Sequence, residues 1–114
     1  MTEQRQRLGA SGEKLAAQWY EANGYEVLDR NWRRREGELD LVVRRNRTIV
    51  FCEVKTRRSD AFGSPGESVT RTKRARVRRL AAMWLQDSPV RPREIRFDVV
   101  AVLDGEVEVI EGAF

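Results

Sequence analysis

The sequence predicts a single α/β domain in which helices flank a mixed β-sheet, with the element order α-β-β-β-α-β-β. Two segments with apolar residues at helical spacing alternate with runs rich in β-branched residues. Two short turn sequences join neighbouring strands into hairpins. The chain has 114 residues, a common size for one domain, and shows no internal repeat. We therefore expect one folded unit over 1–114, with about 1–8 as an N-terminal tail.

The first helix and the first strand are expected in the N-terminal third of the chain. The helix is predicted over 9–23, with Ser11 as its N-cap and Asn23-Gly24 as its stop signal. Its inward face carries apolar residues at helical spacing: Leu15, Ala16, Trp19 and Ala22. A short strand is predicted from Tyr25 to about Asn31, and the arginine-rich residues 32–36 extend it or form a loop.

The central hairpin has the strongest strand signal in the sequence. Segments 38–44 (ELDLVVR) and 48–56 (TIVFCEVKT) are apolar and rich in β-branched residues. Asn46 lies between them and tolerates the positive φ of a tight turn. We therefore predict two antiparallel strands joined by a short connection.

The C-terminal half is expected to contribute one helix and a second hairpin. A loop rich in Gly, Pro and Ser is predicted over 58–66 and a helix from about Glu67 to Gln86. Strands are predicted over 95–103 and 106–111, joined at Asp104-Gly105, which suits a type I′ turn. The helix between the two hairpins completes the predicted order of elements.

Composition excludes several kinds of active site. Histidine is absent, which removes Ser-His-Asp and Cys-His catalysis and zinc–histidine sites. The single cysteine, Cys52, can form neither an internal disulfide nor a thiolate metal cluster. No signal peptide or transmembrane segment is expected, so we expect a cytoplasmic protein without a membrane partner. Catalysis by this chain would depend on carboxylates, lysines or a bound hard cation.

Charge is distributed unevenly along the chain, which has a net charge of +4 and a pI near 9.8. Residues 30–35 hold four arginines and residues 71–79 hold six basic residues, whereas the segment from Asp104 to Glu111 is acidic. Clustered arginine predicts a face that binds a polyanion, most simply nucleic acid and in particular DNA. The alternative is a solvated basic surface without a partner.

The strand around Glu53 carries two charges on one side. Side chains alternate along a strand, so Glu53 and Lys55 share a face. If Asn46-Arg47 is the turn, antiparallel pairing places Asp40 opposite Glu53. The same register places Glu38 opposite Lys55. Because opposed residues have Cβ atoms about 5 Å apart, two carboxylates would then lie beside an ammonium.

A metal ion would relieve the repulsion between two facing carboxylates. Mg²⁺ is the natural occupant, with Mn²⁺ as a substitute, because it binds carboxylate oxygens together with waters and substrate phosphates. The sequence therefore predicts a metal site at Asp40 and Glu53, with the main-chain carbonyl of Val54 as a further ligand. Lys55 would orient or help to deprotonate the attacking water, or stabilise charge on the phosphate. The alternative is a cross-strand ion network on a solvent face.

The order of these residues resembles a known nuclease pattern. Asp40 followed by Glu53-Val54-Lys55 resembles the signature of the PD-(D/E)xK nuclease superfamily, with Leu39 in the place of the superfamily's proline. Five ordered segments resemble the YraN-like family of predicted endonucleases, itself similar to the archaeal Holliday junction resolvases. These segments are GEKLAAQW (12–19), NGYEVLDRNWR (23–33), GELDLV (37–42), VFCEVKTR (50–57) and RFDVV (96–100).

The resemblance implies a restriction-endonuclease-like fold with Asp40, Glu53 and Lys55 as catalytic residues. Related resolvases also use a glutamate from the first helix, which implies a catalytic role for Glu13. The alternative for Glu13 is a favourable charge near a helix N-terminus. Glu38 is expected either to partner Lys55 or to support the site from outside the metal ligands.

Basic side chains around this site are the predicted contacts to nucleic acid. They are Arg33, Arg34, Arg35, Arg57, Lys73, Arg74 and Arg78. Lys73 lies on the inward stripe of the second helix, from which it would reach a phosphate or extend to solvent. Trp32, among arginines, is the predicted stacking platform for a base. Asp98 shares a strand face with Arg96, and we expect a simple ion pair between them.

These observations predict a Mg²⁺-dependent endonuclease that hydrolyses DNA phosphodiester bonds, with branched or junction DNA as the substrate that the resemblance implies. Junction specificity would require a symmetric pair of sites, usually in a homodimer. Two alternatives stay open from the sequence. One is a nucleic-acid-binding module without nuclease activity, and the other is a basic interaction protein with an ion-paired hairpin.

Overall fold

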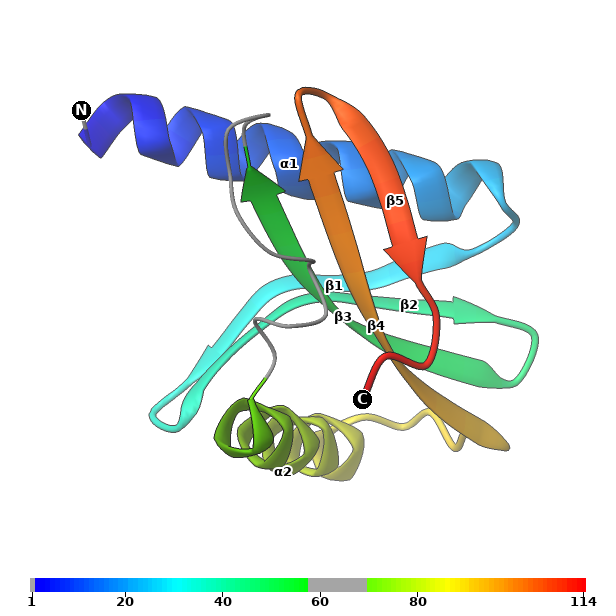
Figure 1. Ribbon diagram of the computed structural model, residues 1–114. Coiled ribbons are helices and arrows are strands. Elements are labelled where there is room, and N and C mark those ends of the chain that lie inside the picture. Colours follow the sequence, from blue (N-terminus) through cyan, green and yellow to red (C-terminus); the bar gives the residue numbers. More distant parts are fainter. Residues whose placement is uncertain (1, 58–69) are drawn as a thin grey trace.

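The computed structural model shows helices and strands in the predicted order (Figure 1). The elements are α1 (Thr2–Ala22), β1 (Glu26–Arg34), β2 (Gly37–Arg45), β3 (Thr48–Arg57), α2 (Arg71–Asp87), β4 (Glu94–Leu103) and β5 (Glu106–Ile110). The structure describes the backbone of 2–57 and 70–114 and the side chains of 12–57 and 70–114. The loop predicted over 58–66 and the helix start predicted at Glu67 lie outside the described residues. The predicted α/β class and element order are confirmed.

The strands form one five-stranded sheet in the order β1-β2-β3-β4-β5. Neighbouring strands are antiparallel except for β3 and β4, which are parallel. Parallel neighbours need a crossover connection, and α2 lies in the segment that provides it. α1 covers one face of the sheet and α2 covers the other, so the sheet is the middle of three layers (Figure 1).

α1 begins earlier than predicted, and within the described residues α2 begins at Arg71. Residues 2–8, expected as a tail, belong to α1 because they include strong helix formers and no proline. Ser11 therefore lies inside α1 and is not its N-cap. α2 begins at Arg71 because Thr70 is extended and its hydroxyl accepts the backbone N–H of Lys73 at 3.2 Å. Neither described helix has the length and apolar character that crossing a membrane requires.

Each helix encloses a core on its own face of the sheet. Along β3, Val50 and Cys52 pack toward α1, whereas Ile49 and Phe51 pack toward α2. Burial on both faces is typical of a central strand. The side of β3 that carries Ile49 and Phe51 continues to Glu53, so this carboxylate emerges on the α2 face.

Asp98 is a fully buried carboxylate in the core under α1. It accepts hydrogen bonds from the Tyr20 hydroxyl at 2.7 Å, from the Gly112 backbone N–H at 3.0 Å and from two nitrogens of Arg96 at 2.9 and 3.0 Å. The predicted ion pair with Arg96 is confirmed, and the hydrogen bonds to Asp98 raise the pKa of Arg96. The network ties α1 to β4 and to the residues after β5.

Gly12 allows α1 to approach β3 closely. A Cβ atom at this position would overlap the hydroxyl of Thr56 and lie 3.1 Å from the Cβ of Thr56. Glycine inside a helix is about 1 kcal/mol less favourable than alanine, so its presence here is explained by this contact. The close approach carries the next residue, Glu13, to the same end of β3.

We expect Gly12→Ala to lower the free energy of unfolding by about 1–3 kcal/mol, because the new methyl group meets Thr56. Combining it with Thr56→Ala, which removes the overlapping hydroxyl and leaves the Cβ, should restore most of the loss. Urea denaturation of the two single variants and the double variant measures this coupling. Equal or greater stability of Gly12→Ala alone would contradict the close approach, since alanine has the better helix propensity.

Candidate active site

The register of the β2–β3 hairpin is the one predicted from its turn. Pairing runs from Arg45 and Thr48 beside the turn to Leu41 and Cys52. Asn46 has the positive φ of a tight turn, at 56°. The register prediction is confirmed over this part of the hairpin.

Beyond Leu41, β2 parts from β3. β2 stays paired with β1 to its first residue, but no further pair joins it to β3 within the described residues. The predicted cross-strand pair of Asp40 and Glu53 is therefore wrong. The predicted pair of Glu38 and Lys55 is wrong for the same reason, because β2 has left β3 before it reaches either position.

An irregularity of β2 at Asp40 explains why the strands part. Leu39 and Val42 both pack toward α2, although a regular strand would point them to opposite faces. On the neighbouring β1, Asn31 has a left-handed φ of 49°. The Asp40 carboxylate accepts the backbone N–H of Val54 at 2.9 Å, in place of a backbone acceptor from β2. A side chain thus satisfies this donor and leaves a gap between the two strands.

Three carboxylates meet at this gap. One oxygen from each of Glu13, Glu38 and Asp40 lies within 4.8 Å of the others. α1 begins well before Glu13, so a charge at the helix N-terminus does not account for this residue. Glu38 is held by Arg33, whose Nε lies 2.6 Å from Oε2. Glu38 therefore belongs to the cluster and is not the partner of Lys55.

Glu53 and Lys55 form an ion pair beside the cluster. Nζ of Lys55 lies 2.9 Å from Oε1 of Glu53, and the two side chains are only 23% and 18% exposed. Oε2 of Glu53 is buried and has no hydrogen-bond partner among the described residues. Burial acts to lower the pKa of Lys55, but the hydrogen bond and charge of Glu53 outweigh it and the pKa is raised. Lys55 is therefore a stable ammonium at neutral pH.

The pKa of Asp40 is raised to about 7. Burial is the main cause, and the charges of Glu13, Glu53 and Glu38 raise it further against the opposing effect of the Val54 hydrogen bond. The neighbouring carboxylates also make the electrostatic field at Asp40 negative. The same field favours a cation.

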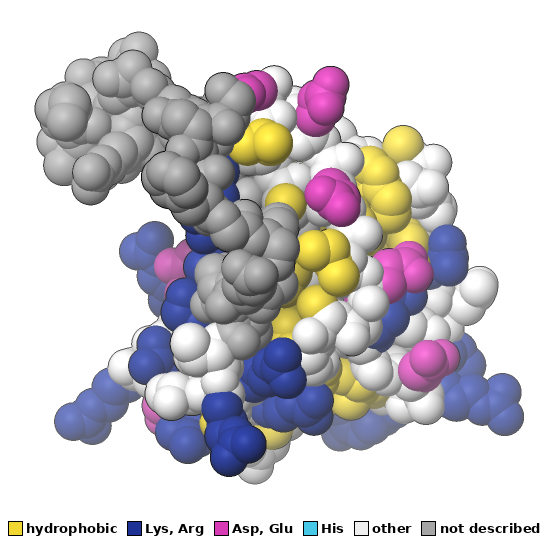
Figure 2. Space-filling view, in the orientation of Figure 1, with side chains coloured by type: hydrophobic (Ala, Val, Ile, Leu, Met, Phe, Trp, Pro, Cys, Tyr) yellow, Lys and Arg dark blue, Asp and Glu magenta, His cyan; other side chains and the backbone are white. Residues whose placement is uncertain are grey.

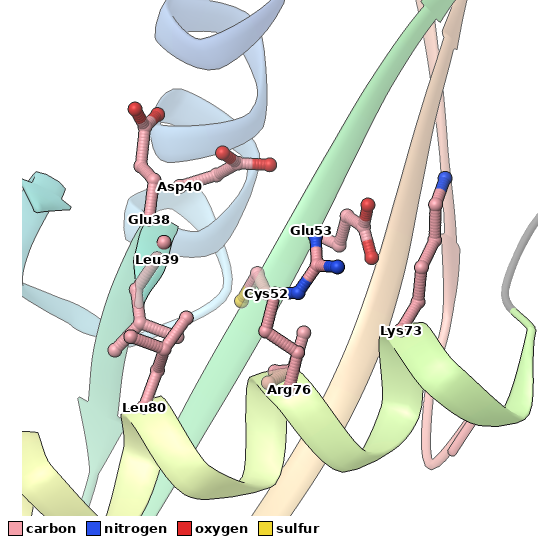
Figure 3. A pocket seen from close by; sticks show the side chains of 10 residues that line it. Glu38, Leu39, Asp40, Cys52, Glu53, Lys73, Arg76 and Leu80 are labelled. Atoms are coloured by element: carbon pink, nitrogen blue, oxygen red, sulfur yellow. The ribbon is translucent and has the colours of Figure 1, made fainter. Parts of the chain in front are cut away.

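A cavity of about 130 Å³ opens beside the carboxylates, between the strands and α2 (Figure 3). Its strand side carries Glu38, Asp40 and Glu53, and its α2 side carries Lys73 and Arg76. Figure 3 shows both basic side chains rising from α2 toward the strands. The cavity therefore places opposite charges on its opposing walls.

Arg76 was predicted only as part of the basic run 71–79 and not as a residue of the site. Lys73, Arg76 and Leu80 follow one another at helical spacing along one side of α2, and Leu80 is fully buried. Arg76 thus sits one turn before a core residue and is directed to the edge of the core. The spacing from Leu80 is the signal that could have identified it.

The other predicted nucleic-acid contacts lie outside the cavity lining. Arg33, Arg34 and Arg35 are exposed at and just after the end of β1, Arg74 and Arg78 are exposed on α2, and Arg57 is half-buried at the end of β3. Figure 2 shows Lys and Arg gathered over the α2 region, in the lower part of the view. The guanidinium of Arg34 lies 4.2 Å from the centre of the Trp32 ring, so a cation already covers one face of the predicted stacking platform.

The fold and the site together define a small mixed-sheet α/β domain with a carboxylate cluster facing basic side chains. Residues 12–102 match the family described as "Uncharacterised protein family UPF0102", and the chain belongs to this family. A UPF0102 protein of Beutenbergia cavernae is 62% identical over 96 residues, covering 84% of this chain and 81% of the relative. A UPF0102 protein of Frankia alni is 52% identical over 112 residues, covering 94% of this chain and 93% of the relative. A UPF0102 protein of Nocardia farcinica is 54% identical over 99 residues, covering 87% of this chain and 78% of the relative.

Asp40→Asn tests the raised pKa of Asp40. Folding raises the pKa of Asp40 from 3.8 to about 7, so the folded state binds this proton more tightly than the unfolded state. The resulting contribution to the free energy of unfolding is fully present below pH 3.8 and is lost as the pH rises through about 7. The variant keeps an acceptor for the Val54 N–H but does not titrate. In the presence of a chelator, we expect it to exceed the wild type in unfolding free energy by on the order of 2 kcal/mol above pH 7, with a smaller difference in acid.

Thermal unfolding from about pH 4 to about pH 8 measures this difference. Glu108→Gln is the control, because it removes an exposed carboxylate from β5 and should follow the wild type at each pH. A difference between Asp40→Asn and the wild type that does not change with pH would contradict the raised pKa.

Proposed function

We propose that this protein is a metal-dependent endonuclease that hydrolyses phosphodiester bonds in DNA. The observation that supports it best is the convergence of carboxylates from α1 and β2 beside the Glu53–Lys55 pair of β3. The resemblance to the YraN-like endonucleases and the PD-(D/E)xK superfamily assigns catalytic roles to these same residues. A cytoplasmic location, where DNA is within reach, belongs to the proposal.

The residues present fit a hard divalent cation such as Mg²⁺, with Mn²⁺ as a substitute. The donors at the gap are carboxylate oxygens, which these ions prefer, and Oε2 of Glu53 is buried without a partner among the described residues. Asp40, Glu13 and Glu38 would hold the ion, with Glu53 beside them. The N–H and C=O of one strand residue point to the same edge, so the Val54 carbonyl also faces the gap and stays a candidate ligand.

Each group at the gap has a distinct part in the proposed reaction. A bound Mg²⁺ would supply a water of lowered pKa and positive charge at the phosphate oxygens. Lys55 would donate hydrogen bonds to charge developing on the phosphate, because its raised pKa makes it a poor base at neutral pH. Glu53 holds Lys55 in place through the 2.9 Å ion pair. The exposed arginines near β1 and on α2 would hold the DNA backbone.

Branched DNA is the substrate class to examine first, because the resemblance extends to junction resolvases. Resolution of a four-way junction needs two sites related by symmetry, so this part of the proposal includes a homodimer. A flap or nicked duplex would need one site alone. Comparing the cleavage rates of these substrates therefore also shows whether one site or two sites act on a DNA molecule.

The proposal predicts cleavage of labelled branched or linear DNA in Mg²⁺ or Mn²⁺ and none in a chelator. Asp40→Asn and Glu53→Gln should each lower the rate by at least about 100-fold, because loss of an outer-shell metal partner alone costs 10–100-fold. Lys55→Gln should lower the rate while binding of Mn²⁺, followed by electron paramagnetic resonance, is retained. Glu108→Gln again serves as the control.

Survival of both branched and linear DNA at high protein concentration with either metal would overturn the nuclease proposal. DNA binding retained in the same samples would then favour the nucleic-acid-binding module. Loss of binding as well would favour the basic interaction protein.

A further inference from the structure

Lys73 and Arg76 project from one side of α2 into the cavity that the carboxylates line. The ion pairs among the described residues include neither of these two side chains; the cations that they engage are Arg33, Arg34, Arg44, Lys55 and Arg96. The cavity wall on α2 is therefore cationic, opposite an anionic wall on the strands. A ligand that carries both a metal-binding oxygen and further negative charge would satisfy both walls.

Gly37 fixes where the stem of Arg76 runs. A Cβ on Gly37 would lie 3.3 Å from Cδ of Arg76 and 3.2 Å from Cδ1 of Leu80. The φ of Gly37 is 149°, which other residues rarely adopt. The bare backbone at the start of β2 therefore lets the aliphatic stem of Arg76 pack against it, although Arg76 is exposed, as Arg74 and Arg78 are. Of these three arginines, only Arg76 lines the cavity. Figure 3 shows the Arg76 side chain rising from α2 toward the strand that carries Glu53.

Lys73 lines the cavity together with Glu53, the ion-pair partner of Lys55, and the positive charge of Lys55 lowers the pKa of Lys73. Two ammonium groups held together repel each other, and Glu53 contacts Lys55 through only one of its oxygens. An anion between Lys73 and Lys55 would relieve this repulsion. The arrangement therefore favours an anionic ligand on the α2 side of the cavity.

The size of the cavity limits what that anion is. A volume of about 130 Å³ is well below the roughly 300–1,000 Å³ of pockets that enclose drug-sized molecules. It accommodates a tetrahedral phosphate better than a base with its sugar. The planar fork of a guanidinium matches two oxygens of one phosphate, while a lysine acts as a point charge.

We propose that Lys73 and Arg76 form a phosphate subsite that holds a backbone phosphate of a nucleic-acid strand against the carboxylate cluster. The inference rests on the proposed function and assigns its substrate-binding residues. Lys73 and Arg76 bind the oxygens that face α2, and the strand side of the same phosphate faces the carboxylates. Specificity at this subsite is for the phosphate and not for the base.

Arg76→Gln, Lys73→Gln and Arg76→Lys test the subsite, with Arg47→Gln as the matched control. Arg47 is exposed in the turn at the opposite end of the hairpin, so its substitution removes the same charge far from the cavity. Binding of a fluorescein-labelled single-stranded oligonucleotide is measured by anisotropy at several salt concentrations, with Ca²⁺ in place of Mg²⁺. Cleavage in Mg²⁺ under single-turnover conditions and Mn²⁺ binding by electron paramagnetic resonance are measured on the same variants.

We expect Arg76→Gln and Lys73→Gln to raise Kd about tenfold and to reduce the salt slope of log Kd by about one. Arg76→Lys should lie between Arg76→Gln and the wild type, because lysine keeps the charge and loses the fork. Mn²⁺ binding should be unchanged. Arg47→Gln should stay within about twofold of the wild type.

The outcomes separate this inference from the nuclease proposal. If the wild type cleaves DNA but Arg76→Gln behaves as Arg47→Gln does in binding and rate, the subsite is overturned and the nuclease proposal stands. Suppose instead that the wild type does not cleave DNA, but that Arg76→Gln weakens DNA binding and reduces the salt slope while Arg47→Gln does not. The subsite then stands and the nuclease proposal falls. Loss of Mn²⁺ binding in Arg76→Gln overturns the subsite, since Arg76 would then act through the carboxylates. Absence of DNA binding by the wild type overturns both.

Discussion

The hydrogen bond from the Val54 N–H to the Asp40 carboxylate is the interaction on which the site depends. In an unbroken hairpin this donor would meet a backbone carbonyl of β2, and the two strands would close against each other. Because a side chain satisfies the donor, the strands part without leaving a buried N–H unpaired. β2 keeps its diverging course because it stays paired with β1. The gap is therefore a stable part of the fold.

The gap brings together side chains that an intact sheet would separate. Glu13 stands on α1 and Arg76 stands on α2, and these helices cover opposite faces. Each helix approaches the sheet closely at a glycine: Gly12 of α1 meets β3, and Gly37 of β2 meets the stem of Arg76. The two close contacts set how far each helix stands from the gap. Glu13 thus reaches the carboxylate cluster from the α1 side, while Arg76 faces the strand carboxylates across the cavity on the α2 side.

Local signals in the sequence were sufficient for the fold and the hairpin register, and they failed where packing at a distance decides the structure. The turn at Asn46 and strict strand alternation determine pairing near the turn, because both are properties of a few neighbouring residues. The parting at Asp40 depends on a bond to another strand and on the packing of Leu39 toward α2, which no local pattern records. Arg76 was within reach of sequence reasoning, because its spacing from Leu80 already places it at the edge of the core.

The buried carboxylate of Asp98 and the partly buried carboxylate of Glu53 differ in how completely they are paired. Asp98 is the more deeply buried, yet its oxygens accept four hydrogen bonds and its charge is balanced by Arg96. Glu53 has one oxygen paired with Lys55 and the other buried without a partner among the described residues. A carboxylate whose oxygens all have hydrogen-bond partners needs no further ligand. A buried carboxylate oxygen without a partner is destabilising until a hydrogen-bond donor or a cation binds it. The core under α1 thus holds a fully paired charge, whereas the gap keeps an incompletely paired one, which the cation of the proposed function would satisfy.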